Sequence, residues 1–167
     1  IANPASAGAM IAVANAMAPP RIGQVLLLSV IVPPETAQPD RREQLLDRAQ
    51  GPLRRALAIS LEDGVFPEAL TTIANNQWAE INRVAREHRC ESLLLGFSDL
   101  SEEVAVTPLD ELLGNVNCDV VVLRARPGWS LPRVRRILIP VAGRGGNARL
   151  RARLLGSLAR TGDRHIT

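Results

Sequence analysis

The stretch CESLLLGFSDLSEEVAVTPLDELLGNVNCDVVVLR, residues 90–124, decides how this chain folds. It opens with a short apolar run, residues 92–96, and closes with a second one, residues 119–123. Apolar runs of this length that are bounded by turn residues are typical of strands buried on both faces. A helix-like segment near residues 108–115 separates the two runs. Two strands joined through a helix make a β-α-β unit, so we predict a parallel sheet.

Two glycines mark the place where a ligand site is expected in this unit. Gly96 ends the first strand, and Gly114 lies near the end of the connecting helix. Ligands of open α/β sheets bind beyond the carboxyl ends of the strands. We therefore expect any small-molecule site to lie next to Gly96.

The same alternation of strands and helices continues on both sides of this stretch. The apolar spacing predicts helices at residues 5–18, 40–59, 77–88 and 147–159, and further strands at residues 24–32, 65–73 and 135–141. Gly51 and Pro52 predict a kink, or two shorter helices, within residues 40–59. Pro67 favours a sheet edge for the strand at 65–73, and Asn76 is a typical helix cap.

The composition indicates a single α/β domain with some chain left over. The chain has 167 residues, of which 46% are hydrophobic and only 2% aromatic, so its core must consist of Leu, Val, Ile and Ala. No apolar stretch approaches the roughly 20 residues that span a bilayer. The first 18 residues lack the basic start and continuous apolar block of a signal peptide.

Cys90 and Cys118 are the two cysteines of the chain. Two are too few for a disulfide framework or a structural zinc site, so we interpret them as reduced thiols of a cytosolic protein. Each precedes a predicted strand at the same end of the sheet, which would bring them near one another. Ordinary thiols at the edge of the core are the simplest interpretation.

Basic residues are concentrated in the last quarter of the chain. Residues 124–164 contain eleven arginines and one acidic residue, Asp163. Such a segment could face an anionic membrane surface or nucleic acid. No aromatic residues alternate with these arginines as base-stacking platforms would, so we favour a solvated helix face and expect no nucleic acid partner.

The beginning and the end of the chain repeat one pattern. Residues 1–28 read as a strand tail, a helix and a strand, and residues 134–167 read as a strand, a helix and a strand start. We predict an α/β domain at residues 1–126 that lacks most of its first strand, a linker at 127–133, and the start of a second repeat at 134–167. By hypothesis, the strand at 135–141 completes the first sheet, within one chain or by exchange between two.

The order of predicted elements resembles the universal stress protein family. Residues 92–100 and 112–124, SLLLGFSDL and LLGNVNCDVVVLR, are similar to that family's fourth strand and nucleotide loop, and to its last helix and fifth strand. The resemblance implies an open, Rossmann-like sheet of five parallel strands in the order 3-2-1-4-5 with helices on both faces. It also implies a homodimer, and residues 119–124 are a plausible exposed edge.

The resemblance assigns particular residues to a nucleotide loop. The family's pattern is Gly-x2-Gly-x9-Gly, then Ser or Thr, then an apolar residue; its glycines let backbone amides wrap phosphates. Gly96 matches the first glycine and Gly114 the third. Asp99 stands at the second glycine, Asn115 replaces the Ser or Thr, and Val116 keeps the apolar position.

These departures indicate a degenerate site for ATP or AMP. The Asp99 carboxylate would repel a phosphate at short range. Asn3 lies where the family's nucleotide-binding members carry an Asp, and Ser98 is the hydroxyl that could contact phosphate, although hydroxyls in loops more often make local hydrogen bonds. A functional ATP- or AMP-binding stress protein is the alternative.

A narrower resemblance concerns transport. Residues 3–30, 71–100 and 134–162 are similar to the cytoplasmic stress-protein-like region that follows the membrane domain of some bacterial amino acid permeases. The resemblance implies a non-catalytic regulatory or binding domain at the inner face of the membrane, with the transporter domain of the same parent chain as its partner. An arginine-rich surface would suit that place.

An enzyme is the weaker interpretation. Residues 143–148, GRGGNA, fit the dinucleotide pattern G-x-G-x-x-A, and Asp163 follows about 20 residues later, as in a dinucleotide-dependent enzyme. Short glycine motifs are common, however, and neither His88 nor His165 has a local partner for nucleophilic catalysis. The acidic pairs at 102–103 and 110–111 are interpreted as solvated surface, so we predict no metal site and no enzyme.

Overall fold

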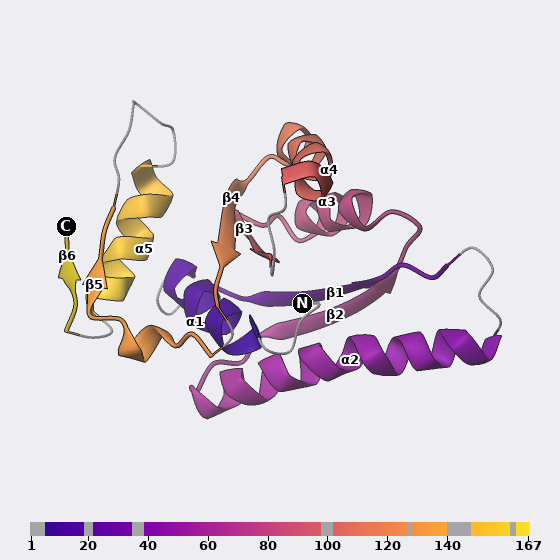
Figure 1. Ribbon diagram of the computed structural model, residues 1–167, viewed down its shortest axis with the longest axis horizontal. Coiled ribbons are helices and arrows are strands. Elements are labelled where there is room, and N and C mark those ends of the chain that lie inside the picture. Colours follow the sequence, from indigo (N-terminus) through magenta and orange to yellow (C-terminus); the bar gives the residue numbers. More distant parts are fainter. Residues whose placement is uncertain are drawn as a thin grey trace.

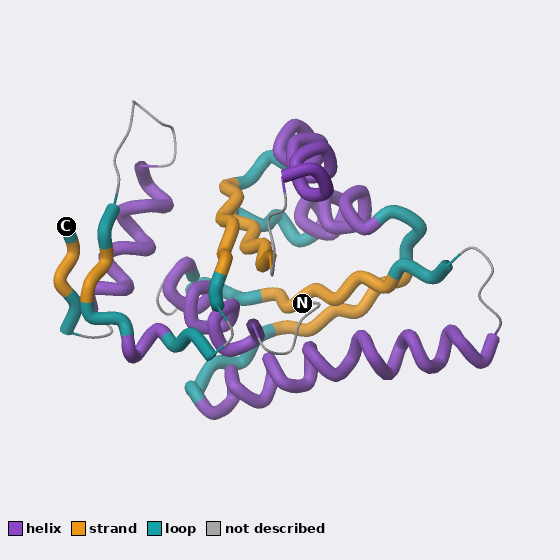
Figure 2. Tube along the Cα trace, in the orientation of Figure 1, coloured by secondary structure: helices purple, strands orange, loops and turns teal. Residues whose placement is uncertain are grey.

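The computed structural model describes residues 6–18, 22–34, 39–97, 102–126, 128–139, 148–160 and 163–167. Its helices are α1 (Ala7–Met17), α2 (Pro39–Glu62), α3 (Gln77–Glu87), α4 (Glu102–Asn115) and α5 (Ala148–Arg160), with a short 3-10 turn at Leu131–Arg133. Its strands are β1 (Leu26–Ile31), β2 (Glu68–Ile73), β3 (Ser92–Phe97), β4 (Asp119–Arg124), β5 (Arg136–Ile137) and β6 (His165–Ile166) (Figures 1 and 2).

The strands form three parallel pairs, and the prediction of one open five-stranded sheet in the order 3-2-1-4-5 is wrong. β1 pairs with β2, β3 with β4, and β5 with β6. The first two ladders contain six residue pairs each, from Leu26 opposite Glu68 and from Ser92 opposite Asp119. The β1–β2 and β3–β4 pairs run in clearly different directions (Figure 1). The parallel β3-α4-β4 unit itself is confirmed.

The sheet is divided because no strand joins β1 to β3 within the described ranges. The strand expected at residues 135–141 to fill that position contributes only Arg136–Ile137 to a ladder, and its partner is β6. The next two described residues, Leu138 and Ile139, extend no ladder of the other two pairs, although Ile139 N donates to Thr167 O at 2.8 Å. In this chain the segment therefore closes its own small unit instead of completing the first sheet.

Helix α1 links the two larger strand pairs by burying two of its faces. Ala7 and Ile11 pack in one core cluster, with residues of β1 and α2. Val13 and Met17 pack in a second cluster with Leu150 of α5, and partly buried side chains of β3 and β4 close it. Because α1 is composed almost entirely of Ala, Met, Val and Ile, it can bury apolar surface on both sides.

The helices around the sheets keep most of their predicted positions. The Oδ1 atom of Asn76 accepts hydrogen bonds from the amides of Trp78 and Ala79, which confirms the cap of α3. Helix α2 continues through Pro52 as one helix, so the alternative of two shorter helices is wrong. Helix α4 begins at Glu102, earlier than predicted from the proline at its middle.

No helix in the described part of the chain is long and apolar enough to cross a membrane.

Strand β2 is an edge strand, as Pro67 predicted. In the described ranges it pairs with β1 alone, and Pro67 directly precedes the ladder, where its missing N–H breaks no inter-strand bond. Helix α2 packs along this strand pair, and α3 contacts β1 from the opposite side (Figure 1).

The β5-α5-β6 unit lies at one end of the molecule and docks through α5 (Figure 1). Leu150 is buried against α1, and Leu154 packs beside it. Arg153 reaches the start of β3, where its Nη1 lies 3.2 Å from Glu91 Oε2 and its Nη2 donates to Ser92 Oγ at 2.9 Å. The predicted second repeat is therefore in contact with the first.

Candidate functional site

A large cavity lies between the two strand pairs. Its volume is about 940 Å³, and its walls come mainly from α1, β1, α3 and β3. Most of its lining is apolar, including Met10, Ile11, Ala14, Leu27, Ile81 and Leu95. Pockets for small molecules measure roughly 300–1,000 Å³ and are lined mainly by apolar groups with a few polar ones. The space left by the divided sheet thus has the size and chemistry of a ligand pocket.

The carboxyl end of β3, where we expected a ligand, is occupied by a methionine. A β-carbon built on Gly96 would lie 2.7 Å from Met10 Sδ, which is closer than such atoms approach. Gly96 therefore provides room for Met10, which is itself buried. In the described structure this glycine serves helix packing between α1 and β3.

Three of the polar residues that line the cavity form a connected group at the amino end of β3. Glu91, Ser92 and Arg153 all line the cavity and are joined by the two hydrogen bonds of the Arg153 guanidinium. The Nε atom of Arg153 is buried and lacks a hydrogen-bond partner. This connected group suits the polar end of a mainly apolar ligand.

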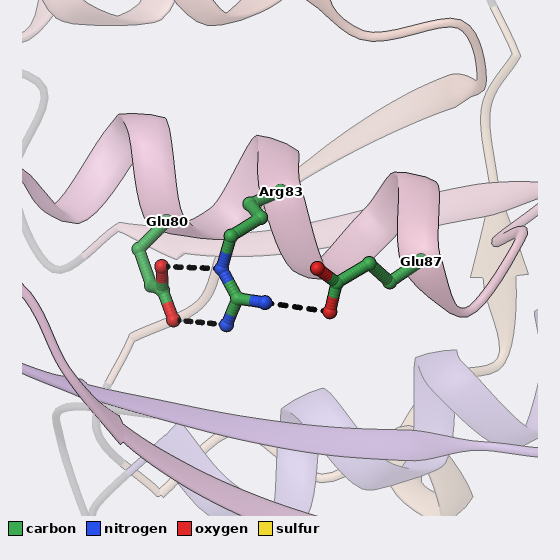
Figure 3. A network of polar contacts seen from close by, with 3 residues as sticks. All are labelled: Glu80, Arg83 and Glu87. Carbon is green, nitrogen blue, oxygen red and sulfur yellow. Dashed lines mark hydrogen bonds and ion pairs between the residues drawn. The ribbon is translucent and has the colours of Figure 1, made fainter.

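Helix α3 forms one wall and keeps its charges on the outside. Ile81, Val84 and Ala85 are buried and line the cavity. On the outer face, Arg83 Nε and Nη2 donate to the two Glu80 oxygens at 2.8 and 2.6 Å, and Nη1 donates to Glu87 at 2.6 Å (Figure 3).

This surface network has a defined electrostatic effect. The hydrogen bond from Arg83 lowers the pKa of Glu80, against an opposing effect of burial. The carboxylates of Glu80 and Glu87 raise the pKa of Arg83. The network orients the outer face of α3 and does not extend into the cavity.

The predicted nucleotide-loop residues that the structure describes are not brought together. Gly96 lies near the carboxyl end of β3. Gly114 lies at the end of α4, and Val116 follows it, before the amino end of β4. Since β3 and β4 are parallel, these two groups lie at opposite ends of the ladder. A β-carbon on Gly114 would meet nothing within 4 Å, so the position cradles no other group.

Asn115, which the resemblance assigned to the nucleotide loop, makes contacts with α4 and α3. Its side-chain Nδ2 donates to Glu111 O at 2.6 Å, and its carbonyl accepts from Arg86 Nη2 at 3.1 Å. It thus closes the end of α4 and joins that helix to α3. Asn3, Ser98 and Asp99 lie outside the described residues, as do residues 143–147 of the dinucleotide pattern.

A second, smaller cavity contains both cysteines. It measures about 330 Å³ and is lined by Asn82, Ala85, Arg86, Arg89, Cys90, Val116, Asn117 and Cys118. Burial raises the pKa of the Cys90 thiol. Burial also raises the pKa of Cys118, and the negative charges of Cys90 and Asp119 raise it further. The expectation that the two thiols are neighbours agrees with this arrangement.

The larger cavity was not predicted from the sequence. Its walls are apolar residues of ordinary strands and helices, so no motif marks them. Among the described residues no group of three or more His, Cys, Asp or Glu could hold a metal ion. What the arrangement offers is a shaped, mainly apolar space for binding.

Comparison with known proteins adds no relative. No protein-family model, curated protein or solved structure matches this chain. The resemblance to universal stress proteins and to permease regions therefore rests on the sequence segments quoted above.

Proposed function

We propose that this chain is a non-catalytic, universal-stress-protein-like domain that regulates by binding a ligand, and that its nucleotide loop is degenerate. One observation carries the proposal, namely the cavity of about 940 Å³ between α1, β1, α3 and β3. The ligand that fits this cavity has an apolar body and one polar end. Its body would lie against Met10 and Leu95, and its polar end near Arg153.

The position of the loop residues supports a ligand other than a nucleotide. A phosphate cradle needs several backbone amides or glycines at one place. Gly96 and Gly114 lie at opposite ends of the β3–β4 ladder, and Met10 covers Gly96. ATP or AMP binding is therefore the alternative that the test must exclude.

The proposal also says where in the cell the domain acts. We infer that the domain serves as the cytoplasmic part of an amino acid transporter, as a homodimer beside the inner face of the membrane. The arginines of α5 support this placement, because a cationic helix is attracted to anionic lipid headgroups. In this arrangement, filling the cavity would change how α1 and α5 pack, since both line it.

The binding test uses a fluorescent probe with the same character as the proposed ligand. Purified protein is titrated with 1-anilinonaphthalene-8-sulfonate, and in parallel by calorimetry with ATP, ADP and AMP. Trp78 lines the cavity, so its fluorescence should be quenched as the probe binds. We expect stoichiometric probe binding and no heat from the nucleotides.

A pair of variants on α1 locates the bound probe. Ala14 lines the cavity, whereas Ala12 on the same helix does not. Ala14→Phe should fill part of the cavity and so remove apolar contact between the probe and the cavity wall. We expect it to weaken probe binding about tenfold. Ala12→Phe is the matched control and should leave binding unchanged.

Two results would count against the proposal. If Ala14→Phe and Ala12→Phe bind the probe equally well, the cavity is not the site. If the wild type binds ATP or AMP stoichiometrically, the loop is functional and the nucleotide-sensor alternative holds. An Asp99→Gly variant, which restores the family's glycine, is then the next comparison.

A further inference from the structure

Cys90 and Cys118 lie on adjacent segments just before the start of the β3–β4 ladder. Asp119 N donates to Glu91 O at 3.1 Å, just before the first ladder pair, Ser92 opposite Asp119. The same register sets Cys118 opposite Glu91, so Cys90 and Cys118 lie on adjacent segments, one residue out of step. If the ladder spacing of about 4.8 Å and the rise of about 3.3 Å per residue continue to these two residues, their Cα atoms lie about 6 Å apart, within the range that a disulfide bridges.

Both thiols also share one space. Cys90 and Cys118 line the same cavity of about 330 Å³, beside the end of α3. Successive residues of a strand point to opposite faces, but neither cysteine belongs to the ladder itself. The shared cavity, and not the strand register, is therefore what places the two residues together. Both residues are partly exposed, so a small oxidant can reach them.

We propose that Cys90 and Cys118 are a reversible redox site, in which a peroxide converts the two thiols to an intrachain disulfide that joins the amino ends of β3 and β4. One thiolate attacks a peroxide oxygen, and the O–O bond breaks to leave a sulfenic acid and one water after protonation. The second thiol attacks the sulfenic sulfur, the S–S bond forms, and a second water leaves. Two thiols and one hydrogen peroxide thus give one disulfide and two waters, and a thiol reductant reverses the change.

The surroundings of the pair set how fast it reacts with peroxide. Burial keeps both thiols largely protonated near neutral pH. The thiolate is the reactive form, so peroxide acts slowly near neutral pH and faster as the pH rises. Such conditional disulfides are the kind found in reducing compartments, where structural ones are rare.

The disulfide would have a mechanical consequence for the unit between the cysteines. It closes a loop that contains β3, α4 and the first turn into β4. Closing a loop of this length restricts the unfolded chain, and we expect the melting temperature to rise by about 5–10 °C. Oxidation would therefore stabilise the β3-α4-β4 unit and leave the β5-α5-β6 unit unchanged.

The test oxidises the whole chain and identifies the product. Reduced protein is treated with hydrogen peroxide, alkylated and weighed by mass spectrometry. We expect a monomer lighter by about 2 Da, with no alkylatable thiol and a Cys90–Cys118 cross-linked peptide. Dithiothreitol should restore both thiols, and the melting temperature should fall back to that of the reduced form.

Single serine variants are the controls. Cys90→Ser and Cys118→Ser each keep one thiol, and each should gain oxygen atoms on that sulfur without forming the lighter species. The proposal is overturned if the wild type keeps two alkylatable thiols after peroxide, if each sulfur is oxidised separately, or if the only disulfides join two chains. The wild-type result decides the matter even if a serine variant fails to fold.

Discussion

The units β3-α4-β4 and β5-α5-β6 have the same topology but are held together in different ways. The first has a ladder of six residue pairs, whereas the second has two. The second unit relies instead on α5, whose Leu150 is 5% exposed and packs against Val13 and Met17 of α1. One topology can therefore be stabilised by its own ladder or by docking on a neighbour.

The local sequences account for this difference. β3 and β4 are nearly continuous apolar runs, with side chains partly buried by the helices beside them. β5 follows Arg135 and consists of Arg136 and the partly buried Ile137, and Leu138, just after the strand, is 78% exposed. A strand with so little apolar surface to bury gains little from pairing, so its ladder stays short.

The largest effect is expected in the first unit. Leu112 of α4 is 2% exposed, and Leu112→Ala should lower the free energy of unfolding by about 2–5 kcal/mol because it leaves a cavity. Chemical denaturation measures this loss. If the first unit is as well packed as its ladder suggests, the variant should also make Cys90 and Cys118 react faster with iodoacetamide.

The next effect separates the second unit from the first. Leu150→Ala should reduce the stability of α5 docking by about 2–3 kcal/mol. Hydrogen exchange should speed up in α5, β5 and β6 while the amides of β3 and β4 stay protected. Leu138→Ala, at an exposed position of the same unit, is the control and should change stability by less than about 0.5 kcal/mol. Equal loss of protection in both units would mean that they unfold together.

The alkylation rate of the two cysteines reports on the β3-α4-β4 unit, because both cysteines belong to it. Their pKa values are raised in the folded chain, so the folded state holds more protons than the unfolded state at alkaline pH. Alkylation of the folded chain should be several-fold slower than that of the unfolded chain near pH 8, and the gap should narrow as the pH rises. The charged groups beside the thiols are Arg86, Arg89 and Asp119.

The raised thiol pKa values also affect stability. Their contribution is fully present below the unfolded pKa, about 8.5, and is lost as the pH rises through the folded pKa. Denaturation should therefore become easier above about pH 9. A folded chain that reacts as fast as the unfolded one at pH 8 would show that the thiols are not held in the first unit.

A smaller effect tests the connection between the two units. Arg153 joins α5 to Glu91 and Ser92, and its side chain is 27% exposed. Arg153→Met keeps the apolar stem and should cost about 1 kcal/mol of α5 docking, measured by hydrogen exchange. Combining it with Glu91→Gln should add little, since both changes remove the same ion pair. Full additivity of the two changes would contradict a direct interaction.

The smallest effect lies outside both units. Glu80 on α3 has a pKa lowered chiefly by the hydrogen bond from Arg83. Its contribution is present above the unfolded pKa, about 4.3, and is lost as the pH falls through the folded value. Glu80→Gln should lower the melting temperature slightly at pH 7, with the difference vanishing in acid. A difference that persists at about pH 2 would show that the ion pair is not its source.

The local structure was largely predictable because it depends on local patterns. Apolar runs and helical spacing identify each element, and the cap at Asn76 and the edge strand after Pro67 follow from single residues. Residue spacing also predicted that the cysteines lie near each other. The exceptions are local too: α2 continues through Pro52, and α4 begins before its proline.

The candidate site was not predictable, because it depends on contacts between distant segments. The sequence identified Gly96 as a loop glycine, but the structure shows it as the contact for Met10, far along the chain. Gly114 was grouped with it by spacing alone, and the parallel register separates them. The large cavity consists of ordinary apolar residues that carry no motif.

By itself, the sequence determined which segments become helices and strands, because apolar periodicity, caps and prolines act within a few residues. The tertiary structure alone decided how the strands pair. Pairing brings together residues far apart in the chain, and α1 packs by two apolar faces in the two core clusters that hold residues of β1 and of β3 and β4. In the result the sheet is divided, a cavity lies between its parts, and β5 pairs with β6.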